Sequence, residues 1–373
     1  MKTITIFGTR PELIKLVSLI RLFEEENVEN INVHTGQHQE LIDPLINIFK
    51  INIDYKISPL SNNRSLGLLL ANIIKEFDDI VKKEKPDLII IHGDTLSTLG
   101  GKLVGFLNNV KVAHIEAGLR TYNLKSPWPE EFVRTVSSIG TEFNFSPTIK
   151  AEKALLNEGI GSKFIHTTGN TVIDILLQTI EAIKKDKGKS IAFNNFLSKL
   201  NPSNKKIILI TAHRRENLDE GFVNLCKAIN EITSKRNDVL FLLPMHLNPM
   251  VRKEILGNLN VSESCKIIEP LDYENFVFLM SKSYIIMTDS GGIQEEAPSL
   301  QKPVIVIRDT TERPELIESG CGVLAGKSFE GILNSVNSIL NDQNIYQNMI
   351  SKRSPFGDGF AAKKIYKVLK KNL

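Results

Sequence analysis

The amino-acid sequence predicts an α/β protein built from two doubly wound, Rossmann-like domains. Its 373 residues exceed what one hydrophobic core ordinarily serves. Continuous apolar, β-branched runs alternate with longer segments in which apolar residues recur every three or four positions, a pattern typical of parallel strands covered by helices on both faces. Unusual polar residues gather where these runs end, which is where parallel sheets bind their ligands.

The first half of the chain holds five predicted strands, and the second half holds four. The first five lie at 3–7, 30–35, 87–93, 110–116 and 163–169. The other four lie at 206–213, 239–246, 284–292 and 303–309. Between the first two strands, "PELIKLVSLIRLFEEE" has helical spacing, with Thr9 placed to cap the helix and Pro11 in its first turn, where proline costs little.

A polar segment without a strand, 184–206, separates the two series. We therefore expect a first domain of residues 1–170 and a second of residues 171–356. A closing helix within 357–373 is expected to cross back onto the first domain.

Composition argues against several classes of protein. The net charge of +3 is small for this size. It gives no reason to expect a nucleic-acid partner, since proteins that bind nucleic acids show a concentrated basic face. The three cysteines lie far apart with no CxxC or CxxH spacing, and we expect no metal site. The first apolar run is too short for a signal peptide, and no stretch is long enough to span a bilayer. We expect a cytoplasmic protein with no membrane association.

The stretch "HIEAGLRTYNLKSPWPEEFVR" places three carboxylates, Glu116, Glu130 and Glu131, between Arg120 and Arg134, directly after a buried strand. Carboxylates crowded at a strand end can shift one another's pKa values and so act as acid and base. The alternative is a structural network in which Arg120 and Arg134 pair with these acids, with one glutamate bound to Arg134. The sequence leaves open which glutamate takes which role.

Similar polar residues follow other strands. In the first half they are Arg10, Lys15, Gln37, His38 and Asp94, and in the second half His213, Arg214, Arg215, His246, Ser290, Gly291 and Gly292.

The fragment "DSGGIQEEAPSL" favours a diphosphate site, because Gly291 and Gly292 let a ligand approach the backbone closely. Glu296 is then within reach of a ribose diol. The alternative is an ordinary tight turn capped by Ser290. Candidate cations for the diphosphate are Arg10, Lys15, Arg215 and Arg313. The first strand's turn lacks GxGxxG, which argues against a nicotinamide cofactor. By itself, His213 is more often a structural residue than a catalyst.

Ten motifs follow one another along the chain: "FGTRPELIKL", "TGQHQELID", "HGDT", "HIEAGLRT", "SPWPEE", "TGNTVID", "TAHRREN", "MHLNP", "TDSGGIQEEAPSL" and "RDTTERPE". Together they resemble the non-hydrolysing branch of the UDP-N-acetylglucosamine 2-epimerase family. The resemblance spans nearly the whole chain. It implies two Rossmann-like domains in a glycosyltransferase-B arrangement with an interdomain cleft, the first carrying the acid/base residues and the second binding UDP. It also implies a homodimer and no cofactor.

The resemblance further implies interconversion of UDP-N-acetylglucosamine and UDP-N-acetylmannosamine, with site residues carried over by position. The implied catalytic residues are Asp94, Glu116, Glu130, Glu131 and His213. The implied substrate-binding residues are Arg10, Lys15, Arg215, Leu271, Phe276, Ser290, Gly291, Gly292, Glu296 and Arg313. Positions implied for a second, activating UDP-N-acetylglucosamine are Gln37, His38 and His246.

Inverting C2 makes particular chemical demands, because its proton is not next to a carbonyl. Breaking the bond from C1 to the diphosphate makes that proton acidic, so the reaction can proceed by elimination to a glycal and re-addition of UDP. The departing UDP requires cations. Inversion also requires an acid and a base on opposite faces of the sugar. The product would be a precursor of surface polysaccharide.

Leu96, Leu99, Val133 and Cys321 depart from the family pattern. Four other activities remain open: a glycosyltransferase of the same architecture, a hydrolytic epimerase, a non-catalytic sugar-nucleotide sensor, and an epimerase of a modified UDP-acetamido sugar.

Overall fold

The computed structural model of the chain describes residues 1–37, 39–58, 65–214, 217–218 and 220–373. These divide into two compact units, each with its own sheet. Unit 1 comprises Met1–Ile175 and Phe356–Leu373, and unit 2 comprises Leu176–Pro355.

Unit 1 contains a seven-stranded parallel sheet in the order β3-β2-β1-β4-β5-β6-β7. Its strands are β1 (Lys2–Phe7), β2 (Glu29–His34), β3 (Tyr55–Lys56), β4 (Leu88–His92), β5 (Lys111–Ile115), β6 (Phe143–Ser146) and β7 (Ile165–Thr167). Its helices are α1 (Arg10–Glu25), α2 (Gln39–Phe49), α3 (Leu66–Glu84), α4 (Leu96–Leu107), α5 (Glu130–Ser138), α6 (Ile149–Asn157), the 3-10 turn η1 (Ser162–Phe164), the start of α7 (Thr171–Lys185) and α16 (Ala361–Asn372).

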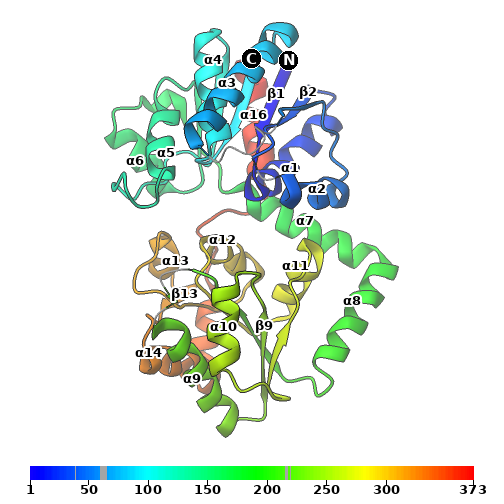
Figure 1. The fold of residues 1–373 in the computed structure, drawn as a ribbon, viewed down its shortest axis with the longest axis vertical. Helices are drawn as coiled ribbons and strands as arrows, with labels where there is room; N and C mark the ends of the chain where they lie inside the picture. Colours follow the sequence, from blue (N-terminus) through cyan, green and yellow to red (C-terminus); the bar gives the residue numbers. More distant parts are fainter. Residues whose placement is uncertain (38, 59–64, 215–216, 219) are drawn as a thin grey trace. The chain divides into compact units, whose positions relative to one another are not determined.

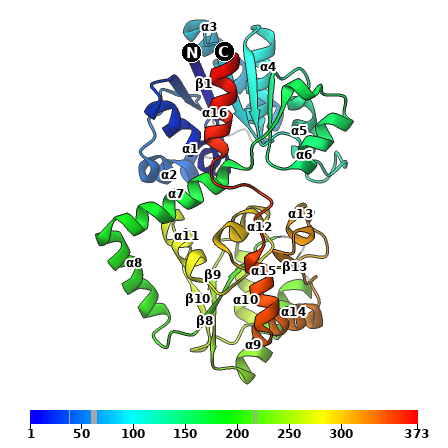
Figure 2. The same cartoon turned by 180° about the vertical axis from the view of Figure 1, so that it is seen from behind.

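Helices cover both faces of this sheet (Figures 1 and 2). On one face α3 and α4 bury Phe77 and Val104 against isoleucines of β1 and β4, such as Ile6 and Ile91. On the other, α1 packs beside the C-terminal helix α16, and the ring of Phe23 meets that of Tyr366 edge-on at 6.2 Å. The apolar strands read from the sequence are therefore buried on both faces.

The C-terminal segment is fixed to unit 1 by specific contacts as well as by burial. Asp174 accepts hydrogen bonds from the backbone N–H groups of Ala361 (3.1 Å) and Ala362 (2.8 Å), at the start of α16. Ile365 and Leu369 of the same helix are fully buried. The last helix is thus an integral part of this domain.

Unit 2 contains a six-stranded parallel sheet in the order β10-β9-β8-β11-β12-β13. Its strands are β8 (Lys206–Thr211), β9 (Val239–Pro244), β10 (Cys265–Ile268), β11 (Ile285–Thr288), β12 (Val304–Val306) and β13 (Gly322–Leu324). Its helices are the rest of α7, α8 (Lys187–Leu200), α9 (Glu220–Lys235), α10 (Pro249–Asn258), α11 (Tyr273–Lys282), α12 (Gly291–Glu296), the 3-10 turn η3 (Ala297–Leu300), α13 (Pro314–Glu318), α14 (Phe329–Asn341) and α15 (Gln343–Ser351).

The predicted fold class is confirmed, and the structure adds four strands that the sequence analysis missed. These are β3, β6, β10 and β13, which span between two and four residues each. β6 is buried yet carries Asn144 and Ser146, so its composition hides its apolar environment. In the described part of the chain, no helix has both the length and the apolar character that crossing a bilayer requires.

Candidate functional site

In each sheet the order of the strands reverses at one point, and the polar residues gather there. In unit 1 the reversal lies between β1 and β4, and in unit 2 between β8 and β11. The loops that leave these strands diverge to opposite sides, and open parallel sheets bind ligands at such positions. The predicted site residues Arg10 and Asp94 follow the first pair of strands, whereas His213 and Ser290 follow the second.

The turn from β1 to α1 is held by a buried carboxylate that the sequence analysis did not single out. Glu12 accepts hydrogen bonds from the backbone N–H of Gly8 (3.0 Å) and of Thr9 (2.8 Å), and from the hydroxyl of Thr95 (2.7 Å). Glu12 therefore ties the turn before Arg10 to the turn after Asp94. Burial raises the pKa of Glu12 to about 7, against the lowering effect of these donors.

Gly8 is required at this turn by space. A Cβ atom there would lie 2.0 Å from the Thr35 hydroxyl oxygen and 2.3 Å from that of Ser97. Arg10, two residues on, is exposed and has no hydrogen-bond or ion-pair partner among the described residues. Its guanidinium is available to an anion, as the sequence predicts for a diphosphate ligand.

Glu116 lies at the end of β5 and is 9% exposed. Its carboxylate forms an ion pair with Lys15 of α1 and accepts a hydrogen bond of 2.7 Å from the side-chain amide of Asn170. Its backbone has φ of +64°, a left-handed conformation that non-glycine residues adopt at a cost and that is often found at functional sites. The structure thus brings Lys15 and Glu116 together.

Asp94 and Glu131 share one guanidinium. Arg134 donates from Nε to Asp94 Oδ2 at 2.7 Å, and its Nη1 lies 3.3 Å from Glu131 Oε2. Burial raises the pKa of Asp94, while Arg134 acts in the lowering direction and Glu116 in the raising direction. The raised pKa favours the protonated form of Asp94 more than in a solvated carboxyl group, which suits an acid/base residue.

The two adjacent glutamates have different environments. Glu131 is 1% exposed, and its Oε1 accepts the backbone N–H of Thr121 (2.9 Å) and of Tyr122 (2.8 Å). By contrast, Glu130 is partly exposed, and its Oε2 has no hydrogen-bond partner among the described residues. Glu131 therefore holds the loop at Thr121 and Tyr122, whereas Glu130 makes no such contact through Oε2 with the described residues. Of the two expected arginine partners, Arg134 pairs with this group, whereas Arg120 binds Glu158 at 2.7 Å.

Neighbouring polar residues in unit 1 are mostly committed to the fold. Burial lowers the pKa of His92 to about 4 and that of His114 to about 3, so both are neutral at pH 7. Gln37 lies beside the β1–α1 turn, and its Oε1 accepts a long hydrogen bond (3.4 Å) from Ser97. His38, predicted beside it, lies outside the described residues.

In unit 2 a fully buried carboxylate organises the strand ends. Asp289 Oδ2 accepts the backbone N–H of His213 (2.9 Å) and of Arg214 (2.8 Å), and the amide of Asn217 (3.0 Å). Its other oxygen lies 3.3 Å from His213 Nδ1. Burial lowers the pKa of His213, while Asp289 acts in the raising direction. The imidazole of His246 stacks on that of His213 with ring centroids 5.1 Å apart, so both histidines lie in one group.

Two guanidiniums flank the predicted glycine turn. Arg313 Nη2 and Arg214 Nη2 lie 3.8 and 3.9 Å from the position that a Cβ atom of Gly291 would occupy. Arg214 Nε is buried with no hydrogen-bond partner among the described residues, whereas Arg313 is ion-paired with Glu295. The predicted Arg215 lies outside the described residues. Two fixed cations beside a glycine backbone suit a diphosphate.

The remaining predicted residues of unit 2 lie on the same or neighbouring elements. Ser290 is the N-cap residue of α12 but makes no capping hydrogen bond through its side chain, so the structure departs from the ordinary capped turn. Glu296 Oε1 lies 3.7 Å from the position of a Cβ atom on Gly292. Leu271 precedes α11 and Phe276 lies on it, and α11 packs against η3, directly after Glu296.

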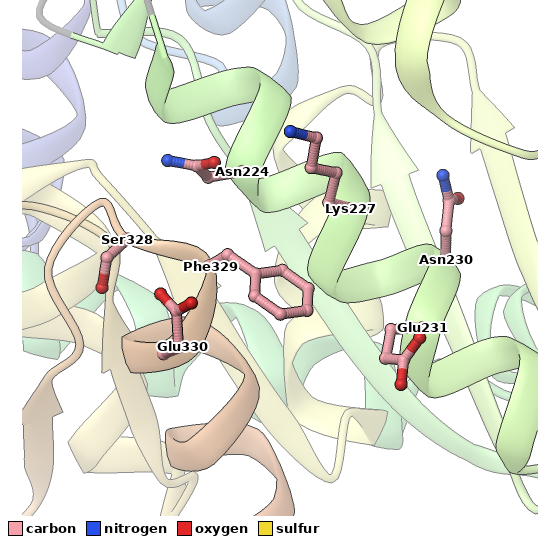
Figure 3. Close-up of a pocket in the computed structure, with 7 residues that line it drawn as sticks. All are labelled: Asn224, Lys227, Asn230, Glu231, Ser328, Phe329 and Glu330. Atoms are coloured by element: carbon pink, nitrogen blue, oxygen red, sulfur yellow. The ribbon is translucent and has the colours of Figure 1, made fainter.

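A separate pocket of about 630 Å³ lies between α9 and the start of α14 (Figure 3). It contains none of the predicted site residues. Two asparagines that line it bond to the backbone: Asn224 donates to Lys327 O (3.2 Å) and Asn230 to Asn258 O (2.9 Å). We therefore interpret the pocket as a gap between packed helices rather than as a ligand site.

Within the described ranges, no three His, Cys, Asp or Glu side chains are grouped so that they could hold a metal ion.

The structure also reveals residues that sequence reasoning missed. Glu12, Asn170 and Asp289 all contact predicted site residues or the same turns. Arg214, which the sequence placed at a strand end without a role, lies beside Gly291. Each lies within a motif quoted from the sequence. Glu12 is two residues from Arg10, Asp289 is one residue from Ser290, and Asn170 has no predicted site residue beside it. The local signal was a polar residue directly after a glycine for Asn170 and directly after a strand for Asp289.

Comparisons with known proteins agree on one family. The family model described as UDP-N-acetylglucosamine 2-epimerase matches residues 21–370. A UDP-N-acetylglucosamine 2-epimerase from Campylobacter jejuni is 42% identical over 99% of this chain and 97% of the relative. One from Neisseria meningitidis is 43% identical over the full length of both chains.

Solved structures show the same fold. The crystal structure of the Neisseria meningitidis enzyme bound to UDP-GlcNAc superposes with a TM-score of 0.90 at 42% identity, covering 100% of both chains. A Methanocaldococcus jannaschii UDP-GlcNAc 2-epimerase in complex with UDP-GlcNAc and UDP gives a TM-score of 0.81 at 33% identity, again over 100% of both chains.

Proposed function

Because the chain belongs to the UDP-N-acetylglucosamine 2-epimerase family, we propose that it interconverts UDP-N-acetylglucosamine and UDP-N-acetylmannosamine by inverting C2. The observation that carries the proposal is the state of three carboxylates in unit 1. Asp94, Glu116 and Glu130 lie after β4, after β5 and at the start of α5, and two of them are fixed by cations while one has an uncommitted oxygen.

In the proposed reaction, a carboxylate of unit 1 takes the C2 proton while the bond from C1 to the β-phosphate oxygen breaks. The bonding electrons of the C–O bond leave with UDP, and a C1–C2 double bond forms. For the return step, the β-phosphate oxygen of UDP attacks C1, and a second carboxyl delivers a proton to the opposite face of C2. Atoms and charge balance without an external reagent.

The developing charge on UDP is the largest electrostatic demand of this reaction. Arg214 and Arg313, beside Gly291, are proposed to bind the diphosphate. Arg10 and Lys15 are proposed as the substrate-binding cations of unit 1. Fixed cations stabilise a leaving group more effectively than water does, because they need no reorganisation. Glu296 is proposed to hold the ribose, and Phe276 and the backbone of Leu271 the uracil.

The roles of individual acids follow from their surroundings. We assign acid/base work to Asp94, Glu116 and Glu130, and loop support to Glu131, whose oxygens are committed to Thr121, Tyr122 and Arg134. For His213, the contact with Asp289 supports a role in orienting the diphosphate or transferring a proton.

The test is incubation of the enzyme with UDP-N-acetylglucosamine in deuterated water without any acceptor. The proposal predicts UDP-N-acetylmannosamine and deuterium at C2 in both epimers. Turnover only with an acceptor would indicate a glycosyltransferase instead. Accumulation of UDP with free N-acetylmannosamine would indicate a hydrolytic epimerase. Repeating the incubation with 6-deoxy and 2,3-diacetamido UDP-sugars tests whether a modified UDP-acetamido sugar is the substrate.

The departures from the family pattern do not favour a non-catalytic sensor. Leu96, Leu99 and Val133 are 7%, 6% and 1% exposed, and Leu96 packs in the core between α3, α4 and the sheet. These substitutions therefore exchange polar groups for apolar packing beneath the site. Tight binding of UDP-N-acetylglucosamine without deuterium exchange would support the sensor.

The cellular context is part of the proposal. We propose a cytoplasmic homodimer whose product is a precursor for surface polysaccharide, and a second UDP-N-acetylglucosamine that activates at Gln37, His38 and His246. Sedimentation tests the dimer. A sigmoidal rate curve that becomes hyperbolic in Gln37→Ala would support the activator site.

A further inference from the structure

We propose that Asn170 is a positioning residue that orients Glu116 for catalysis. This inference rests on the proposed acid/base role of Glu116. Asn170 is 2% exposed and donates through its side-chain amide to Glu116 Oε2 at 2.7 Å.

The amide of Asn170 is fixed in one orientation by a second contact. Its Oδ1 accepts the backbone N–H of Val172 at 3.1 Å, in the first turn of α7, as the side chain of a helix N-cap residue does. Since the oxygen is committed to the helix, the amide nitrogen is the atom that faces Glu116. Flipping the amide of Asn170 would turn its oxygen toward the Glu116 carboxylate and break the hydrogen bond that caps α7. The cap therefore keeps the donor directed at Glu116.

The backbone of Asn170 is held in turn by the C-terminal segment of unit 1. Its N–H donates to Phe356 O at 2.7 Å. A Cβ atom on Gly169 would lie 3.0 Å from the Cα atom of Gly357, and both glycines have positive φ. The chain following Phe356 thus sets the position of the loop that carries Asn170.

Glu116 is therefore held by donors from different elements, Lys15 from α1 and Asn170 from the start of α7. Asp94 after β4, His92 in β4 and His114 in β5 also influence its electrostatic surroundings. The ion pair fixes charge, whereas the planar amide fixes direction. The backbone of Glu116 has a left-handed φ of +64°, which is costly for a non-glycine residue. Both contacts hold the side-chain carboxylate of this residue in place.

The test compares Asn170→Asp, Asn170→Ala and Asn170→Ser with the unmodified enzyme. Asn170→Asp keeps the oxygen that caps α7 and replaces the amide N–H₂ by a second oxygen facing Glu116. We expect the limb of the pH–rate profile that Glu116 sets to move to higher pH by about one unit or more, because two carboxylates then share a site.

Asn170→Ala removes both contacts, and Asn170→Ser retains a capping hydroxyl without the amide donor. We expect kcat for C2 deuterium exchange to fall on the order of 10- to 100-fold in both variants, with KM changed by less than about threefold. Thermal unfolding, followed in parallel, identifies which variants fold. Asn170→Ser supplies the comparison if the alanine variant does not.

A pH–rate profile of Asn170→Asp that matches the unmodified enzyme, with kcat within twofold, would overturn the inference. The variant Glu116→Gln separates this failure from failure of the proposed function. Full activity of Glu116→Gln removes the role of Glu116 itself. If Glu116→Gln is inactive and Asn170→Asp behaves normally, only the positioning role fails. In a double variant, adding Asn170→Ala to Glu116→Gln should lower the residual activity little further, because the two residues act as one unit.

Discussion

Exchanging each of the adjacent glutamates for glutamine should have opposite consequences. Glu131→Gln keeps one oxygen for the backbone N–H groups of Thr121 and Tyr122 but removes the charge that strengthens both bonds. It also places an amide N–H₂ against the Arg134 guanidinium, which is 3.3 Å from the carboxylate. Bonds to a charged group contribute about 1.5–3 kcal/mol each, and breaking a buried pair costs about 3–5 kcal/mol.

From these contacts we expect Glu131→Gln to lower the free energy of unfolding of unit 1 by about 2–4 kcal/mol. Unit 1 has 193 residues, and for that size the loss corresponds to a fall in Tm of roughly 5–15 °C. Glu130→Gln should change Tm by less than about 2 °C, because one of its oxygens has no partner to lose. Its kcat should instead fall by roughly 100-fold or more.

The assay pairs thermal unfolding with C2 deuterium exchange on both variants. Trp128, the single tryptophan of the chain, is 65% exposed in the same loop, so its fluorescence reports the loop directly. The assignment of the two roles would be refuted if Glu131→Gln lost activity with an unchanged Tm while Glu130→Gln lowered Tm and kept its kcat.

Three further predictions concern the cations, a buried acid and a crowded glycine. Arg214→Ala should weaken UDP binding, measured by calorimetry, about 10- to 100-fold, whereas Arg236→Ala, which loses a surface pair with Asp238, should leave it unchanged; equal effects would contradict a diphosphate role. The pKa of Glu12 is raised by burial from 4.5 to about 7, so the folded state binds the extra proton, and its contribution to stability falls as pH rises through that window. Denaturant unfolding should show the unmodified enzyme losing up to about 3 kcal/mol relative to Glu12→Gln between pH 4.5 and 8, and a pH-independent difference would contradict it. Gly357→Ala should destabilise unit 1 more than Gly159→Ala, since both have positive φ but only the first would meet backbone atoms, at 3.3 Å; similar Tm losses would show that crowding against Asn170 is unimportant.

The sequence predicted the fold class because its strands are buried on both faces. Runs such as 88–91 are continuously apolar, as expected for a sheet covered by helices on both faces. The start of α1 at Thr9 was predictable from local capping chemistry. The short strand β6 was not legible, because buried Asn144 and Ser146 give it a polar composition. Its apolar environment is supplied by distant segments.

The site residues themselves were more legible than their partners. Lys15 and Glu116 could be picked out as charged residues near strand ends, but their pairing depends on the juxtaposition of α1 and β5. The division of labour between Glu130 and Glu131 depends on where the loop from Thr121 folds back. Asn170 depends on a contact with a residue 54 positions away, and no local pattern carries that information.

The central claim, that the bond from C1 to the diphosphate breaks and re-forms, is tested most directly by isotope scrambling. UDP-N-acetylglucosamine carrying ¹⁸O in the bridge between C1 and the β-phosphorus is incubated with the enzyme and followed by ³¹P NMR. Free rotation of the β-phosphate of released UDP predicts that the label appears in non-bridging positions, in step with deuterium entry at C2. Epimerisation with the label retained wholly in the bridge would contradict the account.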